Sequence, residues 1–335
     1  AYEITYGDWS SDVCSSDLGF NGAVSKLVEI SFKEIFNDPV KKNVLLIMGN
    51  LFASGEFGLM AATEEGIHKA SEHFGKIIRL IEESLEENLQ IKSILIKDLY
   101  EGNKLYLHLN GHGYSKFEID PEMIFHIHPD WKTIEDYFDL LSSKYRIRAR
   151  STFSKSRELI IKDLTLEDII DHREIIEKLV LEVFNKAPVK LASTSANYCI
   201  ALKSGLGNKF KMTGYFIGTE LVGVASGFID HKTYYAHNIG LNYDFNKSHC
   251  LYQRMLYNFV ENAINENCTI LNFGRDALEI KSTIGAVPKP LTLYVKFPGT
   301  LTSAMLTPFL ALAQTKPWIQ RKPFKSKENT KVTIT

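Results

Sequence analysis

The stretch from Phe210 to Asn242 constrains the fold more than any other part of the chain. Three runs rich in apolar, β-branched and aromatic residues occupy 210–217, 221–229 and 233–242, and only a few turn residues separate them. Strands joined by such short turns pair in antiparallel fashion. The sequence therefore predicts a three-stranded antiparallel meander, and it excludes an all-helical fold.

Helical periodicity appears on both sides of this meander. Apolar residues recur every three or four positions over 63–85, 165–183 and 251–264, and Thr63 is a candidate N-cap of the first of these helices. Another long helix is expected after Pro129. Shorter signals predict strands at 44–48, 91–96, 105–109, 116–127, 269–273 and 291–297, short helices at 196–203 and 277–283, and a loop at 243–249.

Two capping boxes support these helix starts. Thr133 with Asp136 opens the helix after Pro129, and Thr165 with Asp168 opens the helix over 165–183. In each pair the hydroxyl and the carboxylate satisfy each other's backbone N–H groups. Helices therefore alternate with strands along most of the chain, which indicates an α/β protein.

Length and composition limit the class of protein. The chain has 335 residues, of which 44% are hydrophobic and 24% charged, and its formal net charge is -1. Such a composition excludes a disordered chain and a coiled-coil rod, and the length fits about two domains. The neutral charge balance gives no overall reason to bind nucleic acid. Four cysteines without a C-x-x-C pair favour a reducing compartment, so we expect a cytoplasmic protein.

The first residues look foreign to the rest of the chain. The run from Asp8 to Leu18, DWSSDVCSSDL, resembles a DNA-sequencing adapter translated in one frame. Segments of this origin are excluded from fold reasoning. We therefore expect 1–18 to form no part of a packed core, the native sequence before Gly19 to be missing, and the first domain to be incomplete.

Several short motifs carry a family resemblance. They are Lys209-x-x-x-x-Gly214, Leu221-Val-Gly223, Ala236-His237-Asn-Ile-Gly240, Leu251-Tyr-x-Arg-Met255, and Asn272-Phe-Gly-Arg275 followed by Glu279-Ile-Lys281. Together they resemble the FemAB-like branch of the GNAT superfamily, a branch often labelled peptidoglycan biosynthesis or recognition. The resemblance implies an α/β (α+β) fold of tandem GNAT-like, acyl-CoA N-acyltransferase domains, with mixed, mostly antiparallel sheets flanked by helices.

The same resemblance implies a domain plan and a reaction. The plan is a partial first domain at 19–130, a basic linker helix at 131–158, a second domain at 159–298 and a tail at 299–335. The reaction is transfer of an acyl or aminoacyl group from acyl-CoA or aminoacyl-tRNA to an amine, for example of a cell-wall precursor. The alternative is a non-catalytic recognition module that binds a cell-wall precursor or a peptide.

Candidate catalytic residues lie on the third strand of the meander. An amine nucleophile must lose a proton, and the imidazole of His237 could accept it. Tyr235, on the same face, could donate to the oxyanion or the leaving group, and Asn238 is expected to bind substrate. The alternative reading of His237 is a core histidine bonded to the backbone.

A second candidate cluster follows the strand predicted at 269–273. Arg275 and Lys281 could clamp a phosphate or carboxylate of the acceptor, and Asp276 or Glu279 could be the base. The alternative is a surface Arg–Asp pair of little energetic weight. GNAT folds splay open between this strand and the one at 233–242, so we expect His237, Arg275 and Lys281 to lie in one cleft.

The donor is expected at a helix start. GNAT enzymes commonly hold a pyrophosphate with a glycine-rich loop at a helix N-terminus. The matching loop, 245–250, contains no glycine, although Lys247, Ser248 and His249 could contact phosphate. This departure favours either a weakened acyl-CoA site or a solvated, capped helix start.

Basic stretches predict anionic partners. One runs from Lys144 to Arg157 and could bind tRNA, a nucleotide phosphate or lipid head groups, or be a solvated helix end. The other runs from Lys316 to Lys327 after an apolar segment, which fits a helix on the inner face of a membrane or one that covers the first domain. The pair His126 and His128 lacks further ligands at diagnostic spacing, so we expect no metal.

Overall fold

The computed structural model describes residues 42–50, 52–58, 63–103, 109, 112–186, 194–297 and 317–325. These divide into two compact units. Within the described ranges, the first unit holds residues up to 120 together with 290–297, and the second holds 121–289 together with 317–325. The predicted leader at 1–18, most of the predicted strand at 105–109 and the apolar tail segment lie outside the described residues.

The first unit is built on neighbouring strands of the sheet. The strand β1 (Lys42–Met48) pairs in parallel with β2 (Leu89–Leu99), which pairs in antiparallel fashion with β9 (Val287–Lys296). The first half of β3 (Ser115–His126) belongs to this unit and neighbours β9 in the sheet. Thus a strand from the end of the chain lies beside strands from its beginning. The core of this unit is apolar and formed by Phe74, Ile78, Ile94, Ile96, Leu99, Leu109 and Tyr294.

Two helices pack beside these strands, and one of them contributes two of the seven core residues. The predicted helix over 63–85 is divided at His73 into α2 (Glu64–Glu72) and α3 (Phe74–Glu83). The prediction of Thr63 as the N-cap is confirmed, since its side chain accepts a hydrogen bond from the Gly66 N–H at 3.1 Å. The division turns Phe74 and Ile78 toward the sheet, where both are buried.

The second unit contains the meander. Its strand order is β3-β8-β7-β6-β5-β4. The strands are β3 (Ser115–His126, from Pro121 on in this unit), β4 (Ile160–Asp163), β5 (Phe210–Ile217), β6 (Glu220–Asp230), β7 (Thr233–Leu241) and β8 (Ile270–Asn272). The predicted antiparallel pairing of β5, β6 and β7 is confirmed. Only β7 and β8 run parallel in this unit's described pairs.

Eight helices are described in this unit. They are α5 (Ile134–Leu140), α6 (Ser143–Lys155), α7 (Leu166–Asp171), α8 (Arg173–Lys186), α9 (Ala196–Leu206), α10 (Tyr243–His249), α11 (Leu251–Asn265) and α12 (Leu278–Ile284). Both predicted capping boxes are present, at the starts of α5 and α7. Two predicted long helices are each divided, at Leu141–Ser142 and at His172.

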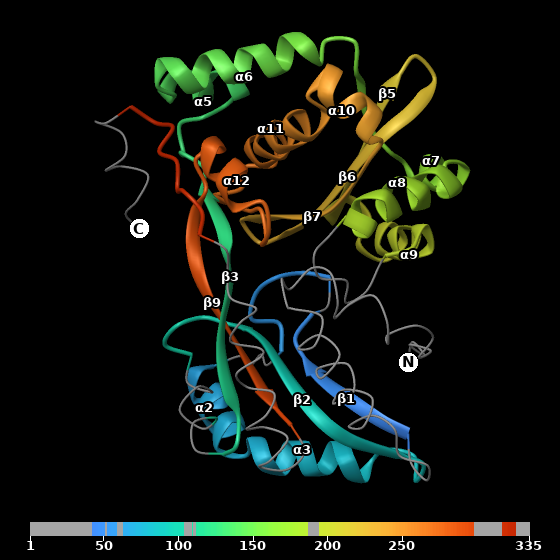
Figure 1. The fold of residues 1–335 in the computed structure, drawn as a ribbon, viewed down its shortest axis with the longest axis vertical. Coiled ribbons are helices and arrows are strands. Elements are labelled where there is room, and N and C mark those ends of the chain that lie inside the picture. The colour runs from blue at the N-terminus through green and yellow to red at the C-terminus, as the bar shows by residue number, and fades with distance from the viewer. Residues whose placement is uncertain are drawn as a thin grey trace, which may run out of the picture. The chain divides into compact units, whose positions relative to one another are not determined.

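Helices cover both faces of the meander (Figure 1). A Cβ added at Gly223 would lie 2.5 Å from the Met255 side chain of α11, whereas one added at Gly240 would lie 2.8 Å from the Val180 backbone of α8. The absence of a side chain at these glycines allows α11 and α8 to pack closely against opposite faces. We call the face toward α8 and α9 the α9 face.

The segment 317–325 completes the core of the second unit. Phe324 forms a β-bridge with Leu141 and is 6% exposed, in ring contact with Phe125 and Tyr137. Trp318 is partly buried against the same cluster. In the part of the chain that the structure describes, no helix has the length and apolarity needed to cross a membrane.

Candidate active site

A β-bulge interrupts the third strand of the meander. Ala225 and Gly227 of β6 pair with Ile239 and Ala236 of β7. Between these two pairs β7 therefore contains one more residue than β6. A bulge of this kind leaves one backbone group unpaired and redirects side chains. Here the Asn238 N–H donates to Ser226 Oγ at 3.2 Å, which satisfies the group that the ladder leaves free.

His237 lies in this bulge. Its Nδ1 is 3.1 Å from Ser226 Oγ, and its ring contacts those of Tyr198 on α9 and Phe228 on β6, with centroids 5.7 and 6.1 Å away. Its Nε2 is buried and has no hydrogen-bond partner among the described residues. Burial lowers the pKa of His237 to about 4. The imidazole is therefore neutral at neutral pH, with one nitrogen uncommitted.

Tyr235 and Asn238 lie beside it. The Tyr235 ring stacks on Phe228 with centroids 4.8 Å apart and planes 11° apart, so Tyr235 and His237 share one aromatic neighbour on the α9 face. Burial, followed by the charges of Asp230 and Glu122, raises the pKa of Tyr235. The Asn238 side chain donates to Thr194 Oγ1, just before α9. The bulge thus brings three of the predicted site residues together.

The pairing of β7 with β8 ends just before this point. β7 and β8 are paired only from Thr233 to Tyr235, because β8 ends at Asn272 while β7 continues to Leu241. His237 lies just past the last pair. The predicted opening between these two strands stays a prediction.

The second predicted cluster has a different structural setting. Lys281 is 7% exposed, and its Nζ donates to the carbonyl oxygens of Phe273, at 2.8 Å, and Arg275. Glu279 is engaged by Arg321 through two guanidinium contacts, one of them 3.0 Å long. Asp276 is exposed and has a φ of 63°. The ammonium of Lys281 therefore holds the turn after β8.

Among the described residues, no hydrogen bond of His237 connects the cluster at the β7 bulge with the cluster after β8. Within the described ranges His237 makes no hydrogen bond to Arg275 or Lys281. The neighbours of Lys281 on α12, Leu278 and Ile284, belong to the core cluster that includes α11. The assignment of Arg275, Lys281, Asp276 and Glu279 to a reaction centre stays a prediction.

The predicted phosphate loop is instead a helix. Residues 243–249 form α10, which corrects the expected loop, and Cys250 with a φ of 50° connects it to α11. Asn246 Oδ1 accepts from the Tyr252 N–H at 2.9 Å, so a first-turn amide of α11 is already occupied.

The three predicted donor-binding residues lie at the end of α10. His249 Nε2 lies 3.6 Å from a carboxylate oxygen of Glu158, and its Nδ1 lies 2.8 Å from Ser248 Oγ. Lys247 and Ser248 are exposed. This arrangement does not fit a cradle of free amides for the pyrophosphate of coenzyme A.

Sequence reasoning missed a buried polar pair near Tyr235. Glu122 is fully buried on β3 and its Oε1 accepts from Asn272 Nδ2 at 3.0 Å, while Asn272 Oδ1 accepts from the Gly274 N–H at 2.8 Å. Asn272 is the register partner of Tyr235. Glu122 directly precedes the apolar run Met123–Phe125 of β3, and this position next to buried residues was the available signal. No group of three or more metal-binding side chains is found among the described residues.

Solved structures resemble this chain in fold. L-PGS from Bacillus licheniformis aligns with a TM-score of 0.50 at 12% identity, over 83% of this chain and 85% of that one. FemX aligns with a TM-score of 0.49 at 11% identity, over 81% and 85% of the two chains. A GCN5-related N-acetyltransferase from Kribbella flavida aligns at 0.36 and 11%, over 70% and 76%.

The fold is similar to that of L-PGS. The strands and helices themselves confirm the predicted class, a mixed α+β protein with mostly antiparallel strands flanked by helices. At 11–12% identity these likenesses concern the fold alone. No protein-family model matches the sequence, and no curated protein is detectably similar to it.

Proposed function

We propose that the chain is an N-acyltransferase whose reaction centre lies at the bulge of β7. One observation carries this proposal: the Nε2 of His237 is buried, unpartnered among the described residues, and part of a neutral imidazole. A buried polar atom without a partner is costly, and such atoms occur where a ligand completes the bonding. The motifs that resemble the FemAB-like branch of the GNAT superfamily, together with the similarity in fold to L-PGS, support acyl transfer as the chemistry.

The proposed step is attack of an amine on an acyl or aminoacyl carbonyl. The nitrogen–carbon bond forms, and the bond from that carbon to the donor's leaving atom breaks. With the Nδ1–H of His237 donated to Ser226 Oγ, Nε2 carries the lone pair. Nε2 accepts the proton that the amine loses, and the leaving group then takes it up.

Two neighbours assist by position. The Tyr235 hydroxyl keeps its proton because the pKa of Tyr235 is raised, so it can donate to the developing oxyanion or the leaving group. Asn238, held by Thr194 and Ser226, fixes the bulge and binds substrate. We place the base at His237 because the carboxylate of Glu279 is engaged by Arg321.

Arg275 is proposed to bind an anionic group of the acceptor. It follows the end of β8, on the turn that Lys281 holds. Arg275→Ala should abolish acceptor use with little loss of stability, and a variant with full activity would remove Arg275 from the reaction. The amine of a cell-wall precursor is the proposed acceptor class, and the cytoplasm is the proposed location.

The test is a donor and acceptor panel with a matched pair of variants. Radiolabelled acetyl-CoA and aminoacyl-tRNA are supplied with amines that include a muropeptide, and amide formation is measured. His237→Gln should lower kcat at least about a hundredfold, whereas His231→Gln, which changes a 93% exposed imidazole, should leave it unchanged. Full activity of His237→Gln would refute the assignment.

The pH profile provides a second readout. Because burial lowers the pKa of His237 to about 4, kcat/KM should not fall with an apparent pKa near 6.5 on acidification. A fall near 6.5 that His237→Gln removes would contradict the buried, neutral base.

A non-catalytic recognition module remains the second candidate. The occupied first turn of α11 favours it, because Asn246 fills a place where donor phosphates bind in many GNAT enzymes. This candidate predicts muropeptide binding without amide formation from either donor. The panel separates the two functions directly.

A further inference from the structure

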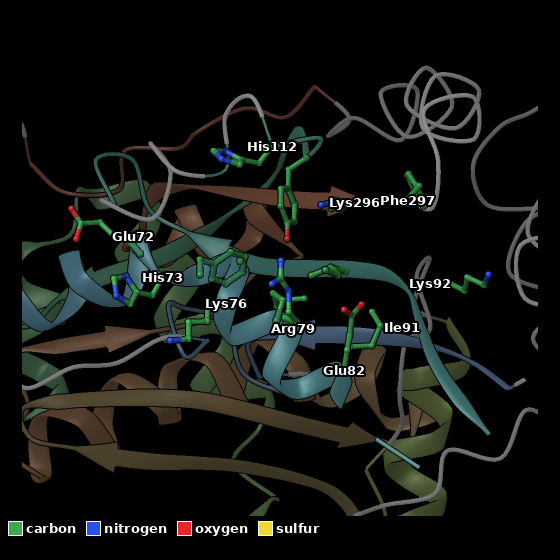
Figure 2. A pocket seen from close by; sticks show the side chains of 16 residues that line it. Glu72, His73, Lys76, Arg79, Glu82, Ile91, Lys92, His112, Lys296 and Phe297 are labelled. Atoms are coloured by element: carbon green, nitrogen blue, oxygen red, sulfur yellow. The ribbon is translucent and has the colours of Figure 1, made fainter. Parts of the chain in front are cut away.

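A polar hollow lies within the first unit, apart from the proposed reaction centre. Its volume is about 720 Å³, and it is bordered by α3, β2 and the end of β9 (Figure 2). The site proposed at the β7 bulge belongs to the second unit, so nothing in the proposed function uses this hollow.

Positive charge dominates its lining. Lys76 and Arg79 on α3, Lys92 on β2 and Lys296 on β9 face only two carboxylates, those of Glu72 and Glu82. Figure 2 shows Arg79 and Lys296 reaching toward the hollow from different elements. His73 and His112 add two imidazoles. Four cations from three elements therefore line the hollow.

The described structure does not pair these cations with the two carboxylates of the lining. Within the described ranges none of the four forms an ion pair. Lys92 and Lys296 are half-buried, and Lys296 Nζ lies 5.2 Å from the centre of the Tyr114 ring. The four cations outnumber the two carboxylates of the lining, so they repel one another, and the partial burial of Lys92 and Lys296 strengthens that repulsion. An anion in the hollow would offset it.

The start of α3 adds to the positive potential. His73 caps this ten-residue helix without a side-chain hydrogen bond, and the first turn contains no acidic residue. Residues from His73 to Lys76 line the hollow. A helix start without an acidic residue leaves the positive end of the helix dipole without a counter-charge from its own first turn, which favours an anion.

The remaining lining is apolar or aromatic. Phe74, Ile78, Ile91, Ile94 and Phe297 contribute to the walls. Burial, followed by the charge of Glu82, raises the pKa of Tyr114 to about 12, which places Glu82 near that ring at the hollow. A simple inorganic ion would leave these apolar walls without contacts.

We propose that this hollow binds an organic phosphate, that is, a phosphate group joined to an apolar or aromatic body. Arg79 and Lys296 hold the phosphate, with Lys76 and Lys92 adding charge around it. The apolar walls take the organic part. Glu82 opposes binding, because its carboxylate lies among the cations.

The proposal is tested with phenyl phosphate as the probe, by calorimetric titration of the full chain. The wild type should bind phenyl phosphate more tightly than inorganic phosphate, because only the former contacts the apolar walls. Arg79→Gln should weaken binding about tenfold, as expected for loss of one charge-assisted hydrogen-bonding group. Glu82→Gln should tighten it several-fold.

These two exposed positions lie on one helix, so a general disturbance of α3 would weaken binding in both variants. Lys69→Gln removes a charge from α2 outside the hollow and serves as the control. Absence of phenyl phosphate binding by the wild type, weakening by Glu82→Gln, or equal weakening by Lys69→Gln and Arg79→Gln would overturn the proposal. Displacement of phenyl phosphate by phosphatidic acid vesicles would support the site and identify a lipid head group as the source of the phosphate. If the vesicles do not displace phenyl phosphate, but Arg79→Gln weakens and Glu82→Gln tightens its binding, the site takes a soluble organic phosphate.

Discussion

Replacing His237 should remove a pH dependence of stability from the second unit. The ordinary pKa of histidine is 6.5, and burial lowers that of His237 to about 4 in the folded chain. Between about pH 4 and pH 6.5, His237 binds a proton in the unfolded state but not in the folded state. Stability is therefore fully present above about pH 6.5 and is lost as the pH falls toward about 4.

The magnitude follows from the displacement of the pKa. A pKa shift of one pH unit corresponds to about 1.4 kcal/mol. The wild type should therefore lose about 2 kcal/mol of unfolding free energy through His237 between pH 6.5 and pH 5, and about 3 kcal/mol by pH 4. His237→Asn should lack this loss, although it is less stable than the wild type at pH 7 because a buried ring is removed. Its stability curve should therefore be flatter.

Urea unfolding followed by tryptophan fluorescence is a suitable assay. Trp131 is buried in the second unit and Trp318 packs against the same core, so the signal reports mainly on that unit. Unfolding free energies are compared at pH 7.0, 6.0, 5.0 and 4.5 for the wild type, His237→Asn and the surface control His231→Asn. If the wild type and His237→Asn lose stability in parallel below pH 6.5, the buried, unpartnered imidazole is not the cause and the reasoning fails.

Three further changes test packing and bonding in the second unit by the same assay. Gly227→Ala should cost about 2 kcal/mol or more, because its Cβ would lie 2.4 Å from the ring of Tyr234, which is 1% exposed; an unchanged midpoint would contradict this packing. Lys281→Met should cost about 3 kcal/mol, because a buried and a partly buried carbonyl oxygen lose their donor, and a cost near zero would show that the ammonium does not hold the turn. Glu279→Gln should cost less than about 1 kcal/mol, because its ion pair with Arg321 is exposed; a loss above 2 kcal/mol would assign the pair a structural role.

Much of the fold was predictable because its signals are local. The meander follows from runs of strand-forming residues with short turns, and the caps at Thr63, Thr133 and Thr165 follow from spacing within one helical turn. Each of these depends on residues that are close in sequence. The predictions failed where a helix divides, as at His73 and His172, since periodicity continues across such a break.

The helix α10 shows the limit of composition. The stretch 243–249 is polar and follows a strand, which is typical of a loop. It is a helix because Asn242 caps it, with Oδ1 accepting from the Asp244 N–H at 3.0 Å. That single contact was readable from the sequence, but the strength of the cap depends on where β7 ends.

The candidate site was predictable in part. The sequence placed His237, Tyr235 and Asn238 on one strand, and the structure brings them together on the α9 face. The bulge that does so involves Ser226 on the neighbouring strand, whose role depends on register across the sheet. The buried setting of Lys281 likewise depends on the turn after β8. Tertiary pairing, which a single sequence does not show, decides both.

The course of the chain between the two units has a consequence for synthesis. The second unit is left at Lys289 and re-entered at Pro317, and Phe324 then fills the aromatic cluster that contains Phe125 and Tyr137. On the ribosome, domains commonly fold as they emerge. Here Phe324 is translated after the residues that it contacts. The second unit should therefore reach its full stability only once residue 325 has left the exit tunnel. A stalled chain that ends near 300 would leave those aromatic rings accessible to chaperones and to neighbouring nascent chains.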